Sequence, residues 1–298
     1  MVESDRLESG YPGKPGSWVR IPPSPYYALR LTARSYVWRA RLRHRFAPDL
    51  ERHTPSAKKG DRVDYKDVQA GNTSNYFWFK AKQDLISVLM AKACGAQTGL
   101  KILSLGAGTG DDLAILKRFG AVHVVDIDAR ALALIDDALC VEKRCEDACR
   151  LSYDNQMFDV VVACDVFEHI LDDASAVAQA YRVLKKGGAL IFTVPAHQWL
   201  FSAHDRALNH HRRYGKKTLN ALMAPFASQK IFYWNSLLFP PIAAKRLCER
   251  WLKPRVNGTF MPGVLNSLGY YLLSLDNNLL NKNFSPPMGV SLVGYCRK

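Results

Sequence analysis

Residues 102–110 read Ile-Leu-Ser-Leu-Gly-Ala-Gly-Thr-Gly, an apolar run that leads directly into three alternating glycines. The run begins at Leu100 and has the length of a strand. Gly106, Gly108 and Gly110 would let the backbone turn sharply and let a ligand approach without a Cβ clash. A dinucleotide-binding loop looks similar, but its fingerprint is Gly-x-Gly-x-x-Gly. The stretch therefore predicts a strand followed by a ligand-binding turn.

Acidic residues follow this turn. In a phosphate-binding loop, the same position is a helix N-terminus that binds the phosphate. Asp111 and Asp112 begin the expected helix, and their charges would repel a pyrophosphate but tolerate a cationic sulfonium. Helix capping is the simpler reading of this pair. Asp126 ends the next apolar run, and a carboxylate at that strand end can accept hydrogen bonds from ribose hydroxyl groups. The three acids favour a nucleoside ligand that carries a positive charge.

Short apolar runs alternate with helical patterns along the rest of the chain. The expected strands span 100–105, 121–125, 158–164, 189–194, 229–234 and 290–296. The expected helices span 111–119, 129–139, 172–184 and 217–224, and an apolar stripe at helical spacing precedes them after Asn75. Apolar strands between helices indicate a doubly wound, parallel α/β sheet buried on both faces. The long interval before the last strand predicts a helical insertion, a cap or lid, at about 236–288.

Further motifs occur in a fixed order after the glycine loop. They are Val125-Asp126, Asp147-Ala148, Phe158-Asp159, the segment Asp165–His169 and the segment Arg182–Gly188. Together with residues 102–110, this series resembles the motif set of class I S-adenosylmethionine-dependent methyltransferases. The last segment reads RVLKKGG, where the family usually has RVLKPGG, so Lys186 replaces a proline.

This resemblance implies a fold and a cofactor site. It implies a seven-stranded sheet in the order 3-2-1-4-5-7-6, with an antiparallel last strand and S-adenosylmethionine at the carboxyl ends of the strands. The three glycines of the loop would face the methionine part of the cofactor. Asp126 would bind its ribose and Asp147 and Ala148 its adenine, while Asp165 would lie near the sulfonium.

Motifs outside the cofactor half extend the resemblance to a bacterial and archaeal subgroup of these methyltransferases, over residues 75–298. They are Phe77–Lys80, Val194–Ala196, His204-Asp205, His210–Tyr214, Asn235–Pro240 and Pro287–Leu292. Members of the subgroup often accompany genes for polyprenyl-linked sugars or cell-surface polysaccharides. The resemblance therefore implies a small-molecule, glycan or lipid-linked acceptor.

Side chains that could move a proton follow the fourth and fifth strands. Those after the fourth are Asp165, Glu168 and His169, and those after the fifth are His204, Asp205, His210, His211 and Tyr214. Both segments leave a doubly wound sheet at the same edge, so they can face one pocket. We expect a metal-free O-methyltransferase in which His169 or His210 is the base, with Glu168 beside them.

Other readings of this group stay open. The pattern Asp165-x-x-Glu168-His169 resembles the Glu-x-x-Glu-His metal site of ubiquinone-biosynthesis O-methyltransferases and small-RNA 3′-end methyltransferases, with His210 as a further ligand. Its first acid is here an aspartate, which has a shorter reach. Glu168 and His169 could instead be a hydrogen-bonded pair that braces the loop. The alternative functions are thus a metal-dependent O-methyltransferase for an RNA or quinone-type acceptor and a catalytically inactive, methyltransferase-like binding module.

The net charge of +14 lies on the flanks of the chain. Residues 1–60 carry 12 Lys and Arg against 5 Asp and Glu, residues 61–197 carry 15 against 19, and residues 198–256 carry 11 against 2. Basic flanks suggest an anionic partner such as a membrane surface, or a solvated face without a partner. No nucleic-acid-binding motif is recognisable, so nucleic acid is not an expected partner.

The first 74 residues differ in character from the rest. Five prolines before residue 26 break any early element, and Val19-Arg20-Ile21-Pro22 matches a translation of the T-arm of a tRNA gene. We expect residues 1–74 to be a poorly ordered basic extension or a non-native read-through. Because no apolar signal-peptide core follows Met1, the expected location is the cytoplasm, either free or peripheral on the inner membrane face.

Overall fold

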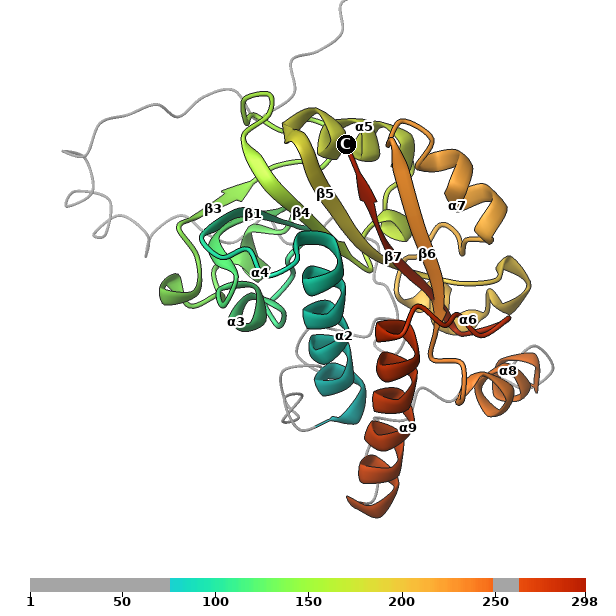
Figure 1. The fold of residues 1–298 in the computed structure, drawn as a ribbon. Helices are drawn as coiled ribbons and strands as arrows, with labels where there is room; N and C mark the ends of the chain where they lie inside the picture. The colour runs from blue at the N-terminus through green and yellow to red at the C-terminus, as the bar shows by residue number, and fades with distance from the viewer. Residues whose placement is uncertain (1–75, 249–262) are drawn as a thin grey trace, which may run out of the picture. The chain divides into compact units, whose positions relative to one another are not determined.

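The computed structural model describes residues 76–248 and 263–298 of the chain (Figure 1). The predicted extension, residues 1–74, lies outside the described residues, as does the part of the predicted insertion at 249–262. Within the described residues, no helix is long and apolar enough to cross a bilayer.

One seven-stranded sheet forms the centre of the fold, in the order β3-β2-β1-β4-β5-β7-β6. β7 runs antiparallel to both of its neighbours, and the other neighbouring strands are parallel. The strands are β1 (Leu100–Leu105), β2 (Gly120–Asp126), β3 (Glu142–Cys145), β4 (Phe158–Cys164), β5 (Leu184–Pro195), β6 (Ser228–Trp234) and β7 (Ser291–Arg297). The predicted order and the antiparallel last strand are confirmed.

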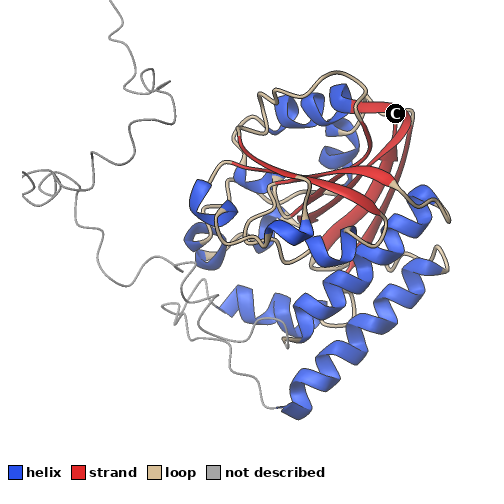
Figure 2. Cartoon of the chain, turned by 90° about the vertical axis from the view of Figure 1, so that its left-hand side faces the viewer, coloured by secondary structure: helices blue, strands red, loops and turns tan. Residues whose placement is uncertain are grey.

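The central strands are mostly apolar because both faces of the sheet are covered by helices (Figure 2). In β4, Val161 and Ala163 belong to one buried cluster, whereas Val160 and Val162 belong to another on the opposite face. This alternation is the two-residue period of a strand. The first cluster includes side chains of α5 (Asp173–Val183) and α7 (Lys216–Leu222), and the second includes side chains of α2 (Phe77–Cys94) and α9 (Gly263–Asn281).

The helices around β2 are shorter than predicted. The helix expected at 111–119 is reduced to α3 (Leu113–Leu116), because the chain must leave it to reach Gly120, whose added Cβ would lie 1.9 Å from the Leu100 carbonyl oxygen. The helix expected at 129–139 is split into α4 (Ala129–Leu132) and the 3₁₀ turn η3 (Asp137–Leu139). The Asp136 carboxylate accepts a hydrogen bond from the Ala138 N–H and so begins a new turn inside the predicted helix.

The predicted insertion contains α8 (Phe239–Cys248) and α9, and α9 lies beside α2 (Figure 1). Gly269 of α9 allows a close approach, since a Cβ there would lie 2.8 Å from the Phe77 ring. The buried Asn277 side chain donates to the Ala81 carbonyl oxygen over 3.0 Å and accepts from Trp234 Nε1 over 2.8 Å. These contacts make α9 a packed part of the domain.

Candidate functional site

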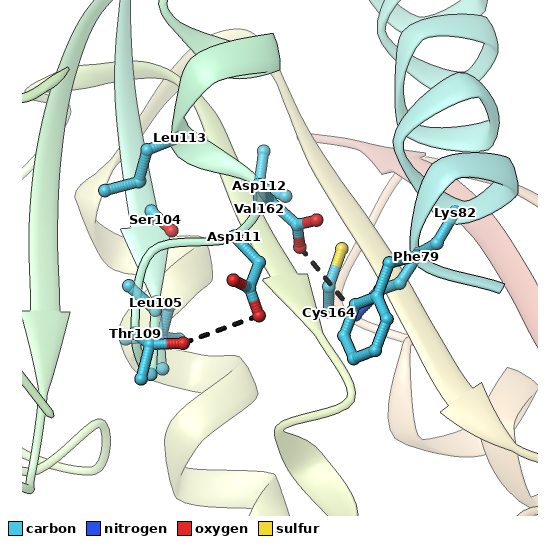
Figure 3. Close-up of a pocket in the computed structure, with 13 residues that line it drawn as sticks. Phe79, Lys82, Ser104, Leu105, Thr109, Asp111, Asp112, Leu113, Val162 and Cys164 are labelled. Atoms are coloured by element: carbon cyan, nitrogen blue, oxygen red, sulfur yellow. Dashed lines mark hydrogen bonds and ion pairs between the residues drawn. The ribbon is translucent and has the colours of Figure 1, made fainter. Parts of the chain in front are cut away.

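A cavity of about 200 Å³ lies above the glycine loop, between α2 and the ends of β1 and β4 (Figure 3). Its lining combines loop backbone with an apolar floor and charged side chains. The lining residues are Phe79, Lys82, Ser104, Leu105, Gly106, Ala107, Gly108, Thr109, Asp111, Asp112, Leu113, Val162 and Cys164.

All three glycines of the loop have positive φ, at 67° for Gly106, 54° for Gly108 and 85° for Gly110, which other residues adopt only under strain. A Cβ on Gly108 would meet no protein atom within 4 Å, so the space above it is open to a ligand. Gly110 has a different role from the one expected. It is buried, and an added Cβ would lie 2.9 Å from the side chain of Leu113.

Asp126, at the end of β2, holds the loop in place. Its Oδ2 accepts from the Gly108 N–H and its Oδ1 from the Asp128 N–H, each over 2.8 Å. Each oxygen of a carboxylate can accept more than one hydrogen bond. The carboxylate therefore has remaining acceptor capacity, as ribose binding requires. Asp126 reaches the cavity through Gly108, since Asp126 itself, like Gly110 and Asp165, is not among the lining residues.

Lys82 is a cavity residue that sequence reasoning missed. Its ammonium lies 2.9 Å from Asp165 Oδ2 and 3.7 Å from Asp112 Oδ2. Burial alone would lower the pKa of Lys82, but these two carboxylates raise it well above its ordinary value. A signal was present in the sequence, because Lys82 falls on the apolar stripe of α2, between Ala81 and Leu85, where a charge needs a partner.

The capping interpretation of Asp112 is wrong. Asp112 occupies the N-cap position of α3 but its side chain makes no capping hydrogen bond, since it is turned toward Lys82 (Figure 3). Asp165 has φ of 56° and also accepts from Thr193 Oγ1 over 2.9 Å. Desolvation of the half-buried Asp165 opposes ionisation, but Lys82 and this hydrogen bond lower its pKa.

The two residues expected to bind adenine do not line the cavity. The Asp147 carboxylate accepts from the Cys149 N–H over 2.8 Å, and Asp147 is exposed beyond the end of β3. Ala148 is half-buried and packs against the core.

The three predicted catalytic residues come together at the carboxyl ends of β4 and β5. One oxygen of Glu168 and one ring nitrogen each of His169 and His210 lie within 4.8 Å of one another. The two imidazole rings are 4.5 Å apart and nearly perpendicular, at 89°. Glu168 and His169 stand on the 3₁₀ turn η4 (Phe167–His169), whereas His210 follows α6 (Ala203–Ala207).

Hydrogen bonds fasten the segment that carries His210 to η4 and α5. The His211 N–H donates to the Glu168 carbonyl oxygen over 2.8 Å, and the Tyr214 hydroxyl donates to Asp173 over 2.7 Å. Tyr214 is thus a buried brace, and the side chains of His204 and His211 are exposed. Of the polar residues predicted after the fifth strand, His210 is the one that joins the cluster.

The cluster combines a histidine of lowered pKa with a carboxyl group of raised pKa. Glu168 is 1% exposed and its Oε2 has no hydrogen-bond partner, and burial together with the nearby Asp165 raises its pKa well above the usual range. The His169 side chain is exposed at the surface, yet desolvation by the residues around it and the neighbouring His210 lower its pKa to about 4. At neutral pH, His169 therefore has an unprotonated ring nitrogen that can accept a proton or bind a metal.

Known methyltransferases resemble the part of the chain that contains the glycine loop. Residues 103–192 match a family model described as a methyltransferase domain. The chain is 30% identical over 151 residues to the ubiquinone/menaquinone biosynthesis C-methyltransferase UbiE of Stutzerimonas stutzeri, covering 42% of this chain and 59% of that protein. It is 29% identical over 116 residues to a ubiquinone biosynthesis O-methyltransferase of Bradyrhizobium sp., covering 37% and 45% respectively.

The chain thus spans about half of the length of the curated relatives it matches. Among solved structures, phosphoethanolamine N-methyltransferase 2 of Haemonchus contortus in complex with S-adenosyl-L-methionine superimposes with a TM-score of 0.52 at 19% identity, covering 80% of this chain and 58% of that one. This similarity shows a shared fold.

Proposed function

We propose that this chain, which carries a class I S-adenosylmethionine-dependent methyltransferase domain, is an active O-methyltransferase in which His169 or His210 takes the proton of the acceptor. The observation that carries the proposal is the convergence of these histidines and Glu168 at the carboxyl ends of the strands, the edge of the sheet where the cavity also lies. Asp165 connects the two places, because it pairs with Lys82 in the cavity and belongs to the same loop as His169.

The residues of the cavity fit S-adenosylmethionine. The open space above Gly108 leaves room for the cofactor, and Asp126 can accept the ribose hydroxyl groups. Lys82 offers a positive charge for the cofactor carboxylate, and Asp112 and Asp165 offer negative charges for its ammonium and sulfonium groups. A site of mixed charge beside a glycine loop suits an amino-acid cofactor better than a pyrophosphate.

The chain's residues would act by alignment and by proton removal. When bound, S-adenosylmethionine supplies a methyl group on a positively charged sulfur, and its transfer to oxygen leaves neutral S-adenosylhomocysteine. The acceptor hydroxyl loses a proton as the carbon–oxygen bond forms, and a neutral imidazole can take that proton. Glu168 beside the two histidines is buried, and burial raises the pKa of its carboxyl group, which favours the uncharged form.

Single substitutions of the histidines test this function. His169→Ala or His210→Ala should lower turnover at least about tenfold while leaving the affinity for S-adenosylhomocysteine unchanged in calorimetry. His211→Ala removes the adjacent exposed imidazole and is the matched control. Normal turnover in both cluster variants would refute the assignment of the base. Absence of S-adenosylhomocysteine binding by the unmodified protein would refute the function itself.

A divalent metal site is the second candidate, and the same cluster favours it. Two imidazole nitrogens and a buried carboxylate oxygen without a hydrogen-bond partner form a suitable set of ligands. The first acid of the pattern, Asp165, is already held by Lys82 and Thr193. If a chelator abolishes turnover and added Mg²⁺ or Mn²⁺ restores it, the metal-dependent reaction replaces the metal-free one.

We further propose that the acceptor is lipid-linked and that α9 rests on the cytoplasmic face of an anionic membrane. While one face of α9 packs against α2, another exposes apolar side chains at helical spacing. Val264 is 81% exposed, Leu268 51% and Tyr271 60%. An exposed apolar stripe next to basic sequence is typical of a helix that lies on a bilayer surface.

A further inference from the structure

The carboxylate of Asp205 is the most heavily hydrogen-bonded side chain near the cluster. Asp205, on α6, is fully buried. Its Oδ2 accepts from the Ser202 N–H over 2.8 Å and from Arg246 Nη1 over 3.1 Å. Its Oδ1 lies 2.8 Å from Arg213 Nε, 2.7 Å from Arg213 Nη2 and 3.2 Å from His210 Nδ1.

These contacts fix which groups carry protons. A carboxylate paired with two guanidinium groups stays ionised. An ionised carboxylate can only accept hydrogen bonds. The His210 Nδ1 facing it must therefore carry a hydrogen, which leaves the lone pair of a neutral ring on Nε2.

We propose that Asp205 is a positioning residue of this enzyme, which holds His210 in the Nδ1–H tautomer so that its Nε2 is the nitrogen offered to the acceptor. The inference rests on the proposed function of His210 as a base. The same tautomer would suit His210 as a metal ligand, because a metal ion also binds the unprotonated nitrogen. Arg213, which is 5% exposed, and Arg246 keep the carboxylate itself from moving.

Nitrogen NMR of the full-length protein labelled at histidine tests the tautomer directly. Spectra are recorded at mildly alkaline pH, where an ordinary imidazole is neutral, and His210 is assigned by its loss in His210→Gln. We expect a protonated Nδ1 and an unprotonated Nε2 for His210 in the unmodified protein. A protonated Nε2 would overturn the proposal, and this result does not depend on any variant folding or on any acceptor.

Asp205→Asn then separates positioning from structure. It should move the His210 signals toward the other tautomer and lower kcat at least about tenfold with little change in the KM for S-adenosylmethionine. Asp173→Asn is the matched control, since Asp173 braces the same segment through Tyr214 and Arg212 without contacting His210. Unchanged His210 signals in folded Asp205→Asn, or equal shifts in Asp173→Asn, would refute the role of Asp205. If Asp205→Asn changes the tautomer but His210→Ala leaves turnover normal, it is the base assignment that fails.

Discussion

At the scale of single residues, backbone constraints were readable from the sequence and long-range charge pairs were not. The residue type of Gly106 and Gly108 predicts positive φ. Asp126 follows them at the distance along the chain that places it at the end of the next strand. Lys82 lies in α2 and Asp112 immediately before α3, and their pairing depends on how α2 crosses the sheet. No local pattern encodes that crossing, so the charge balance of the cavity could not be predicted.

Lys82 should recognise the amino-acid end of the cofactor. Lys82→Met should weaken binding of S-adenosylhomocysteine about 10- to 100-fold, the loss expected for a hydrogen bond to a charged group. Binding of 5′-methylthioadenosine, which lacks the amino-acid part, should change little in the same calorimetric assay. Lys80→Met is the control, because the Lys80 ammonium lies over the Tyr270 ring outside the cavity. Equal losses for both ligands would mean that Lys82 only maintains the fold.

The buried Glu168 should make the folded protein less stable as the pH rises. Burial raises the pKa of Glu168 in the folded protein. Its contribution to the free energy of unfolding is therefore fully present below the unfolded pKa of about 4.5 and is lost as the pH rises toward the folded pKa. Glu168→Gln should therefore melt at a higher temperature than the unmodified protein near pH 8, and the difference should vanish near pH 4. Melting is followed in the presence of chelator, so that no metal ion can stabilise the carboxylate. A pH-independent difference would show that Glu168 is ionised in the folded state.

At the scale of elements, strands were predicted more accurately than helices. The expected strand 158–164 agrees with β4, because burial on both faces gives an apolar run that only Asp159 interrupts. The expected helices 111–119 and 129–139 were too long, since Gly120 must pass close to Leu100 and Asp136 begins its own turn. Both causes lie outside the helical periodicity from which the predictions were made.

The pairing of α2 with α9 should depend on Asn277. Asn277→Ala leaves the buried Trp234 N–H and the Ala81 carbonyl oxygen without their partner, so we expect the free energy of unfolding to fall by about 1–3 kcal/mol. Urea denaturation measures the change. Asn278→Ala, at the adjacent exposed position, should leave stability nearly unchanged or slightly higher. A similar loss in both variants would locate the effect in the helix itself.

At the scale of the whole molecule, the motif order was sufficient to predict the sheet but not the surface. The seven-strand order is the one that the resemblance to class I methyltransferases implied. What α8 and α9 contact depends on single residues such as Gly269, which has no side chain, and Arg246, and neither belongs to a motif. The predicted cap could therefore be located along the chain, but its packing could not.

The exposed stripe of α9 should govern membrane association. The unmodified protein should float with vesicles that contain anionic phospholipid, and replacing Val264 and Leu268 with serine should reduce the floating fraction. Replacing the exposed Leu134, which lies after α4, is the matched control. Equal flotation of the α9 variant and the control would rule out this stripe as the membrane contact.

The position of β7 has a consequence for synthesis on the ribosome. β7 lies between β5 and β6 and pairs with both, yet it is the last strand to be made. While residues 196–290 emerge, the nascent chain keeps one edge of β5 unpaired, with Phe192 and Val194 among the residues that await a partner. An unpaired apolar edge is a template for other chains. Cells that make this protein therefore have to shield the unfinished sheet, and translation that stops before Ser291 should yield aggregates that chaperones and proteases must clear.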